Sequence, residues 1–505
     1  MYNKVQSAVL HGMEVHLVEV QADISEGLPV FDMVGLPGSE VKESRERVRT
    51  ALRNSGFRIP PKRITVNLSP ADLKKEGTAF DLPIAAAILR GITNIPDAFE
   101  NGIIIGEVGL DGSVIPVRGA ISIAKHAQAL GYCRILCAKE NAEECRNTAK
   151  LSCIGVSSLK EMAAYLQEGT LPPQESCITE ETMPSLPDFS DLAGLEVAKR
   201  AAEIAVAGRH HFLMVGPPGA GKTMIAKRMM SIFPALNDEE RNLQAELLSI
   251  MGLPALSPDR PFRSPDASVT AAAFLGGGQK MLPGEMVLAN DGILFLDELP
   301  SYPSRILDLL RIPMEEGKVI LTRKNGAYEF PADFMFVGAM NPCPCGFYPD
   351  MQRCKCTPDQ RIRYRRRVDG PLLDRIDLYL SLQPMDYEGI SGGRGCGENS
   401  ETIRGRVTQA WERQQNRYEK EKFHFNARMP AEKIPVYCAL GRTEQSLMER
   451  YYKRYRLSAR AYHKVLKVAR TIADLDGSDQ IRSAHLTEAI HLRCDDPEAE
   501  GRLKR

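Results

Sequence analysis

The sequence predicts a protein of three domains, in which a central α/β domain lies between an α+β domain and a helical domain. Three observations support this prediction. Residues 212–223 read as a strand, a glycine loop and the start of a helix, residues 1–165 alternate strand-like with helical runs, and four helical stretches follow residue 401. A chain of 505 residues is long enough for about three domains, and its 43% hydrophobic residues can fill their cores.

Composition limits the partners and the compartment. The 65 basic and 65 acidic residues give a net charge of zero, so a nucleic-acid partner must be met by a local patch. No run reaches about 18 apolar residues and the first residues do not form a secretion signal, so we expect no membrane contact and a cytoplasmic location. The 12 cysteines are spread along the chain, which favours reduced thiols or metal ligands over disulfides.

The first domain is expected over residues 1–167. Strands are predicted at 15–20, 63–68 and 102–108, and helices at 40–54, 82–90 and 121–130.

Residues 168–190 are rich in Pro, Ser, Thr and Glu without periodicity, which predicts a linker. An amphipathic helix from residue 191 then opens the central domain, expected over 191–384. This helix could pack near an adenine base or simply against the core.

The glycine loop has the G-x-x-x-x-G-K-T spacing of a phosphate-binding loop. Its glycines let the backbone N–H groups approach a phosphate chain at a helix N-terminus. Lys222 would neutralise the β- and γ-phosphates of ATP, and the Thr223 hydroxyl would bind Mg²⁺. A plain Gly-Pro turn is the alternative, which the flanking strand and helix disfavour. The predicted nucleotide-binding residues are Gly216, Pro217, Pro218, Gly219, Ala220, Gly221, Lys222 and Thr223.

A second buried strand, at residues 292–296, ends in two carboxylates. Ligands of open α/β sheets bind at the carboxyl edge of the strands. Asp297 is therefore expected to hold Mg²⁺, and Glu298 to orient and deprotonate the attacking water. The pair could also be an ordinary strand exit, but its place about seventy residues after the glycine loop favours the catalytic interpretation.

Two more polar residues complete the predicted core site. Asn341 follows a strand at residues 334–339 and could position the lytic water. Arg375 lies in a turn between a helix and a strand, where it could stabilise charge on the γ-phosphoryl group of a neighbouring subunit. A structural salt bridge to Asp374 or Asp377 is the alternative role for this arginine.

The remainder of the chain is expected to form a lid. Residues 385–400 are rich in glycine and predict a flexible loop, and residues 401–505 predict a helical domain. Its helices are expected at 402–422, 442–455, 459–474 and 483–492. Arg460 could reach back to the nucleotide, or it could be an ordinary solvated side chain.

The order of these motifs is similar to that of AAA+ ATPases. Three longer segments narrow the resemblance, namely RPFRSPDASVTAAAFLGGGQKMLPGEMVLANDGILFLDELP, MNPCPCG and RYRRRVDGPLLDRIDL. They resemble the magnesium-chelatase-related ComM/YifB family over nearly the whole chain. The resemblance implies a P-loop NTPase core with a helical lid, in a ring that we expect to be a homo-hexamer. The catalytic set that it implies is Lys222, Glu298, Asn341, Arg375 acting in trans and Arg460 as a second sensor.

The first domain resembles the protease domain of Lon, through GEVGLDGSVIPVRGAISIAKHA at residues 106–127. In that family a serine pairs with a lysine, and the matching positions here carry Ala79 and Ile121. Because a serine–lysine dyad needs both partners, the resemblance implies a Lon protease-like fold without activity. Ser69 and Ser122 leave an unrecognised dyad open.

The family resemblance also implies an insertion in the helix after the glycine loop and a hairpin before the asparagine strand. Residues 270–278 end in three glycines, and residues 318–330 contain Asn-Gly between strand-like flanks, a strong hairpin signal. Arg323 and Lys324 stand beside the turn, and in a ring pore they could follow a DNA backbone. Charged edges that prevent aggregation are the alternative.

Four cysteines form a C-x-C, eight residues, C-x-C pattern. Cys343, Cys345, Cys354 and Cys356 could close a tetrahedral Zn²⁺ site. The C-x-C pairs are tighter than the usual C-x₂-C pairs, so packed free thiols and redox sensing stay open as alternatives.

The resemblance favours an ATP-hydrolysing ring motor acting on single-stranded or branched DNA, as a helicase or in branch migration during recombination or natural transformation. The alternative is a chelatase-type ATPase that remodels a protein partner. The chain has no D-x-S-x-S metal-adhesion motif and no acidic-proline linker, and its first domain is of a kind that chelatase subunits lack. A nucleotide-switched scaffold is disfavoured by the intact Asp297, Glu298 and Arg375.

Overall fold

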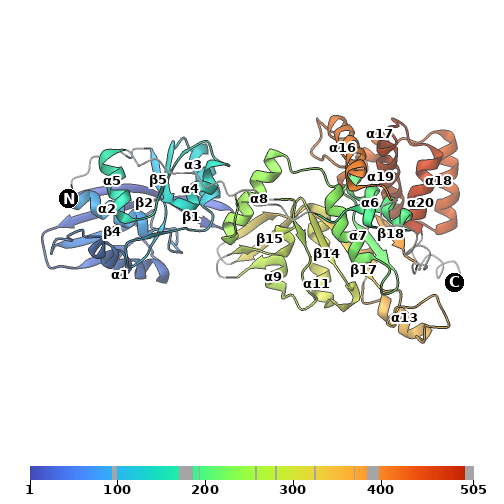
Figure 1. Cartoon of the computed structure of the whole chain (residues 1–505), viewed down its shortest axis with the longest axis horizontal. Coiled ribbons are helices and arrows are strands. Elements are labelled where there is room, and N and C mark those ends of the chain that lie inside the picture. Colours follow the sequence, from blue (N-terminus) through green and yellow to red (C-terminus); the bar gives the residue numbers. More distant parts are fainter. Residues whose placement is uncertain are drawn as a thin grey trace.

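The structure is a computed structural model. It describes residues 1–93, 99, 101–169, 186–192, 194–255, 259–278, 281–323, 326–368, 370–383 and 397–494. Figure 1 shows an elongated molecule, with the N-terminal domain at one end and the central α/β domain and the helical lid packed together at the other. No helix within these ranges is long and apolar enough to cross a membrane.

The N-terminal domain is built on a seven-stranded mixed sheet in the order β3-β4-β2-β1-β5-β8-β9. In β2, Val18, Val20, Ala22 and Ile24 are buried, the period-2 pattern of a strand with one face on a core. The strands are β1 Tyr2–His11, β2 Glu14–Ser25, β3 Phe31–Val34, β4 Arg63–Ser69, β5 Gly102–Ile104, β8 Arg134–Ala138 and β9 Ser152–Val156.

Helices cover both faces of this sheet. One face shares a core with α1 Ser39–Asn54, α2 Asp81–Thr93 and α5 Leu159–Glu168, and the other face packs against α3 Ala120–Ala129 and α4 Lys139–Arg146. The prediction of α1, α2 and α3 is confirmed to within a few residues.

The predicted strand at residues 102–108 is wrong. It is two strands, because Gly106 N–H leaves the sheet and donates to Ala79 O at 3.0 Å. After this break β6 Glu107–Val108 pairs with β7 Val114–Ile115.

The Lon-like interpretation of the N-terminal domain stays a prediction. Ala79 and Ile121 occupy the two positions where that family has its dyad, and Ile121 is fully buried. The hydroxyl of Ser122 is buried with no hydrogen-bond partner among the described residues. The ammonium of the buried Lys75 donates to Pro70 O. Within the described part of the chain, Ser122 and Lys75 therefore form no serine–lysine pair.

The central domain holds a parallel sheet in the order β11-β14-β17-β10-β18. Every residue of β10, β14 and β17 is buried, which accounts for their uninterrupted apolar sequences. Because the strands run parallel, their carboxyl ends share one edge. The strands are β10 Phe212–Val215, β11 Phe262–Arg263, β14 Ile293–Leu296, β17 Met335–Met340 and β18 Leu378–Ser381.

Helices connect the strands of the central domain. They are α6 Glu196–Gly208, α7 Lys222–Met229, α8 Asp238–Met251, α9 Ala271–Leu275, α10 Glu285–Leu288, α11 Ser304–Leu309, α12 Arg311–Glu316, α13 Pro358–Arg365 and α14 Gly370–Leu373. The short strands β12 Gly276–Gly277 and β13 Leu282–Pro283 pair antiparallel.

The predicted start of the first core helix at residue 191 is wrong. Phe189–Asp191 form a 3₁₀ turn with Phe189 fully buried, and α6 begins only at Glu196. The intervening Gly194 has φ of 71°, outside the helical region. Of the predicted linker, residues 170–185 lie outside the described residues, and its last residues belong to the central core.

The predicted hairpin is present as β15 Lys318–Arg323 and β16 Gly326–Pro331, paired antiparallel. The side chain of Arg323 and all of Lys324 lie outside the described residues. The hairpin stem packs against the N-terminal domain, since a Cβ at Gly12 would lie 3.1 Å from Tyr328 Cδ1 and 3.3 Å from Phe330 Cζ.

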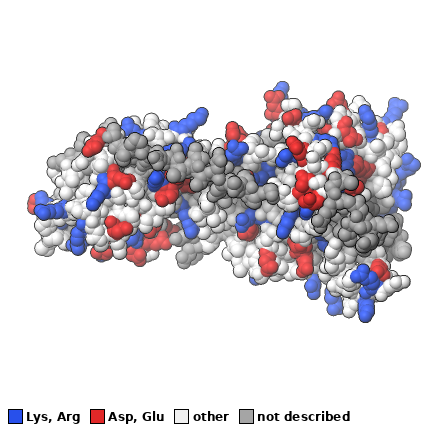
Figure 2. All heavy atoms as spheres, viewed as in Figure 1, with Lys and Arg blue, Asp and Glu red and all other residues white. Residues whose placement is uncertain are grey.

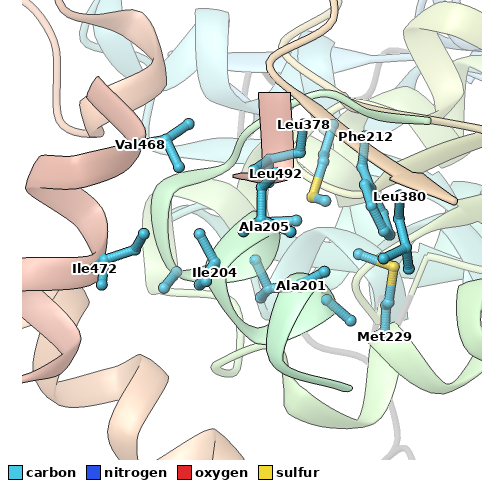
Figure 3. Close-up of a cluster of buried hydrophobic side chains, with 14 of the residues drawn as sticks. Ala201, Ile204, Ala205, Phe212, Met229, Leu378, Leu380, Val468, Ile472 and Leu492 are labelled. Carbon is cyan, nitrogen blue, oxygen red and sulfur yellow. The ribbon is translucent and has the colours of Figure 1, made fainter. Parts of the chain in front are cut away.

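The helical lid confirms the four predicted helices. They are α16 Ser400–Arg417, α18 Arg442–Tyr455, α19 Ala459–Leu475 and α20 Ser483–Cys494, with the short α17 Ile434–Tyr437 between the first two. Most of the predicted flexible loop, namely residues 385–396, lies outside the described residues. Figure 3 shows Ile204 and Ala205 of α6 between Phe212 of the sheet and Ile472 of α19, so the lid and the sheet share one hydrophobic core.

Candidate functional site

The glycine loop connects β10 directly to α7 at the carboxyl edge of the sheet. Gly221 is the N-cap of α7 with φ of 83°, and Gly219 has φ of 80°. A side chain at either position would be strained, and apart from its chain neighbours no atom of the described residues lies within 4 Å of the Cβ position of Gly219. Gly216 is required for packing, because its Cβ would lie 2.8 Å from Leu382 Cβ. The loop therefore presents free backbone at a helix N-terminus, the arrangement that binds phosphate.

Lys222 directs its ammonium group into this loop. Its Nζ donates to Gly216 O at 2.7 Å, to Pro217 O at 3.0 Å and to Asn341 Oδ1 at 3.0 Å. Burial lowers the pKa of Lys222, and the charges of Asp297 and Glu298 oppose this shift. The ammonium is thus held at the edge of the sheet by neutral oxygens, where a phosphate oxygen would be a stronger acceptor.

The predicted magnesium ligands touch each other. Thr223 Oγ1 donates to Asp297 Oδ2 at 2.6 Å, although the two residues belong to α7 and to the end of β14. Hydroxyl and carboxylate oxygens are the hard ligands that Mg²⁺ prefers. The fit of this pair to a hydrated Mg²⁺ ion rests on that donor set and on the adjacent phosphate loop.

Glu298 follows Asp297 in a left-handed backbone conformation, with φ of 49° and ψ of 50°. Its N–H donates to Asp297 Oδ1 at 2.9 Å, and its side chain is exposed. Strain of this kind at a non-glycine residue costs about 1 to 3 kcal/mol and is concentrated at functional sites. Glu298 lies close enough to Lys222 for its charge to oppose the lowering of the Lys222 pKa.

Asn341 is the first residue after β17. Its Oδ1 accepts the hydrogen bond from Lys222 Nζ, which places it at the site. The chain after it continues to touch the glycine loop. A Cβ at Gly346 would lie 2.5 Å from Pro218 Cδ and 3.8 Å from Asn341 Cγ. Tyr364 of α13 was not predicted as part of this region, yet it packs on the same core, and burial raises its pKa.

Arg375 is held by its own subunit. Its Nη2 lies 2.9 Å from Glu315 Oε2, and its Nε and Nη1 donate to Arg311 O and Pro371 O at 2.9 and 2.8 Å. Arg375 therefore does form a salt bridge within its own subunit, but the partner is Glu315, and the predicted partners Asp374 and Asp377 are wrong. Glu315 lies sixty residues earlier, on α12, and no local sequence signal indicates it.

The lid is hydrogen-bonded to Arg375 and to the segment that follows it. Lys464 Nζ of α19 donates to Arg375 O at 2.7 Å and to Asp377 Oδ1 at 2.6 Å. Arg460 lies in the first turn of the same helix, is exposed and forms no hydrogen bond or ion pair within the described part of the chain. The structure thus brings Lys222, Thr223, Asp297 and Asn341 together, and it does not place Arg460 among them.

The four cysteines converge. All four Sγ atoms lie within 4.8 Å of one another, with Cys343 to Cys345 at 3.4 Å and Cys343 to Cys354 at 3.7 Å. A tetrahedral site with Zn–S bonds of about 2.3 Å requires separations of about 3.8 Å. The cluster, which Cys356 completes, therefore has the size of a zinc site.

Comparison with known proteins identifies related chains. Residues 188–390 match the family described as magnesium chelatase, subunit ChlI, residues 397–493 match the C-terminal part of that subunit, and residues 20–141 match the family described as subunit ChlI of Mg-chelatase. The YifB protein of Salmonella typhimurium is 42% identical over 494 residues, covering 96% of both chains. The competence protein ComM of Haemophilus influenzae is 38% identical over 502 residues, covering 97% of both.

A more distant relative is similar over part of the chain. The probable DNA helicase MCM9 of Arabidopsis thaliana is 27% identical over 183 residues, which are 36% of this chain and 24% of the relative.

The geometry generates a prediction that separates ATP binding from hydrolysis. Lys222→Ala should weaken ATP binding by at least about tenfold, because the charged donor of the loop is lost. Glu298→Gln should keep ATP binding and lower the hydrolysis rate by roughly 10² to 10⁴, the contribution of a general base. Binding is measured with a fluorescent ATP analogue and hydrolysis by phosphate release. Lys227→Ala, an exposed lysine on the same helix, is the control. Normal hydrolysis by Glu298→Gln would contradict the assignment.

Proposed function

The chain belongs to the family of YifB and ComM, which shares its domains with the ChlI subunit of magnesium chelatase, and from this premise we propose that it is an ATP-hydrolysing ring motor that acts on DNA. The observation that carries the ATPase part is the convergence of one ammonium, one hydroxyl, one carboxylate and one amide at the carboxyl edge of three parallel strands. The residues are Lys222, Thr223, Asp297 and Asn341.

The proposed roles follow from these positions. Bound Mg·ATP supplies an activated phosphoanhydride whose γ-phosphoryl group water can attack. Lys222 and the loop N–H groups would bind the phosphate oxygens, and the Thr223 and Asp297 oxygens would hold the magnesium. Glu298 orients a water and accepts its proton, and Asn341 positions Lys222 and that water. Two of these contacts are already formed, since Lys222 is hydrogen-bonded to Asn341 and Thr223 to Asp297.

A ring arrangement is proposed to complete the site. A single chain holds Arg375 against Glu315, on the part of the central domain formed by α12 and α14. An arginine from a neighbouring subunit could stabilise charge on the γ-phosphoryl group only if the Glu315 contact is exchanged for the phosphate. The Glu315 carboxylate is about half exposed, so the ion pair itself contributes little, and the exchange must also break the bonds of Arg375 to Arg311 O and Pro371 O. We expect a homo-hexamer in the presence of ATP.

The DNA substrate is supported by two relatives and weakened by one match. The name of ComM refers to competence, and the name of MCM9 to a probable DNA helicase. However, residues 20–141 match a family named for subunit ChlI, so the N-terminal domain no longer argues against a chelatase-type function. A chelatase-type ATPase that remodels a protein partner is therefore the second candidate, favoured by the three family matches.

We further propose that Cys343, Cys345, Cys354 and Cys356 hold one structural Zn²⁺. The Sγ separations suit tetrahedral coordination, and two of the thiols are buried. The ion would fix the loop that packs Gly346 on Pro218. Its role would be structural, because four cysteine ligands leave no open position.

The trans role of Arg375 predicts complementation between inactive subunits. Arg375→Ala and Glu298→Gln proteins should each be nearly inactive. In an equal mixture about a quarter of the interfaces pair an intact Glu298 with an intact Arg375. The ATPase rate of the mixture should therefore be about a quarter of the wild-type rate. Activity and assembly are followed by phosphate release and mass photometry. A mixture of Glu298→Gln with Lys222→Ala, which lie in one site, should stay inactive. Rings without recovery would mean that Arg375 serves only its Glu315 contact.

The motor proposal predicts DNA-stimulated hydrolysis. Steady-state ATPase rates are measured with branched, duplex and single-stranded DNA and without DNA. One form should raise the rate several-fold, and Glu298→Gln should abolish both the basal and the stimulated rate. A rate indifferent to every DNA form would contradict the motor and favour remodelling of a protein partner.

The zinc proposal predicts one Zn²⁺ per chain after dialysis, measured by mass spectrometry of the metal. The double variant Cys354→Ser/Cys356→Ser should contain none, since two remaining thiolates bind weakly. Cys133→Ser, at an exposed cysteine of the N-terminal domain, should keep the full amount. Wild-type protein free of zinc when purified without chelators would overturn the proposal.

A further inference from the structure

A basic arm projects from the central domain beside the candidate ATP site. We define it as residues 343–368, which comprise the four-cysteine loop and α13 Pro358–Arg365 with the residues that follow it. Figure 1 shows α13 standing away from the body of the molecule, and Figure 2 shows Lys and Arg side chains gathered at that tip. No residue of α13 is fully buried.

The arm is strongly cationic in a chain of zero net charge. Arg353 and Lys355 lie on the loop, and five more arginines lie on and after α13, namely Arg361, Arg363, Arg365, Arg366 and Arg367. The only carboxylates in the arm are those of Asp350 and Asp359. Among the described residues, none of the seven cations forms an ion pair, whereas seven of the nine arginines of the central domain outside the arm whose side chains are described do. An unpaired cluster of this kind attracts a polyanion.

Aromatic rings fix some of these guanidinium groups. The Arg353 guanidinium lies 4.1 Å from the ring centre of Phe347, and that of Arg361 lies 4.3 Å from the ring centre of Tyr348. A guanidinium stacked on a ring keeps its N–H edges free for phosphate oxygens and loses little conformational entropy on binding. Arg363 on α13 and Arg366 and Arg367 in the turn that follows the helix are all exposed.

The arm is joined to the ATP site at its base. Asn341, whose Oδ1 accepts from Lys222, precedes the first cysteine by two residues. Gly346 in the loop packs on Pro218 of the phosphate loop, and Tyr364 of α13 packs into the core of the central domain. A ligand that moves the arm therefore acts on the elements that hold Lys222.

We propose that the basic arm binds the phosphate backbone of nucleic acid. This inference rests on the DNA motor proposed above and identifies the surface through which the motor would bind its DNA. The cations are spread over the loop and over a helix about 12 Å long. One DNA strand presents a phosphate every ~3.4 Å of duplex axis, so such a row meets several phosphates at once. The triphosphate of a neighbouring subunit offers the same chemistry at one point only, and the test below distinguishes it.

The test compares two triple variants of the full chain. Arg363→Gln/Arg366→Gln/Arg367→Gln removes three exposed cations from the arm. Arg49→Gln/Arg53→Gln/Arg58→Gln removes three exposed arginines from the N-terminal domain and is the matched control. Binding of fluorescein-labelled single-stranded and duplex DNA is measured by anisotropy over a range of salt concentrations, and ATPase rates are measured with and without DNA.

The arm variant should bind DNA at least about tenfold more weakly at 0.1 M salt. Its slope of log affinity against log salt should be smaller by about 2 to 3 for duplex DNA, which corresponds to about 0.9 per lost phosphate contact. The ratio of DNA-stimulated to DNA-free ATPase rate should fall. The control should match the wild type, and Arg363→Lys/Arg366→Lys/Arg367→Lys should restore the salt slope because it keeps the charge.

Three results would overturn the inference. If the wild type binds DNA and the arm variant binds equally well, the inference fails while the motor stands. If the arm variant keeps its DNA affinity but loses DNA-free ATPase activity, the cations serve the nucleotide of the neighbouring subunit. If the wild type binds no DNA in any form, the motor and the arm proposal fail together.

Discussion

The parallel register of three central strands is the constraint on which the candidate site depends. Val215, the last residue of β10, pairs with Met340 of β17 on one side and with Ser381 of β18 on the other. Because of this alignment, the glycine loop and Asn341 begin at the same level along the strands, and Gly216 N–H donates to Met340 O at 3.1 Å. A slip of one residue would turn each side chain to the opposite face and remove the contact between Lys222 and Asn341. The apolar strands therefore act on function by fixing where the polar residues begin.

The lid is tied to the same edge by buried charge. Asp377 is buried against Lys464, His210 and the backbone N–H of His211. Burial alone would raise the pKa of Asp377, but the charge of Lys464 and the neighbouring imidazoles hold it well below the usual range. Burial lowers the pKa of Lys464 to about 8. Loss of one partner from such a pair leaves an uncompensated buried charge, at a cost of about 3 to 5 kcal/mol. The position of α19 is thereby specified relative to the turn that carries Arg375.

The sequence was sufficient where the signal is local, and insufficient where it depends on distant residues. The glycine loop, the DE strand, the hairpin and the lid helices follow from patterns within about twenty residues. The start of α6 was missed because Gly194 breaks a helical pattern that periodicity alone extends. The Glu315 partner of Arg375 could not be predicted, since only the tertiary packing of α12 beside α14 brings it within 2.9 Å. The four thiols were predicted as a set, but only the fold of the loop shows that their separations suit one ion.

The N-terminal domain is connected through α8 to the strand that precedes Asp297. Gly119 N–H donates to Ser249 O at 2.9 Å, and the ammonium of Lys125 contacts the carboxylate of Glu246, so α3 is bound to α8. The same helix reaches the central sheet, because the side-chain amide of Gln244 donates to Asn290 O just before β14. The chain of contacts continues along β14 to Asp297.

Coupling between distant sites requires such packed, contiguous elements with more than one arrangement. The docking of the N-terminal domain buries Ala245 and Ala255 in its own core, and the hairpin stem closes on Gly12 from a second direction. A rigid rotation of this domain must therefore either break both contacts or carry α8 with it. In the second case the displacement reaches β14, the strand that precedes Asp297, so the contacts of α8 connect the N-terminal domain mechanically to the candidate site.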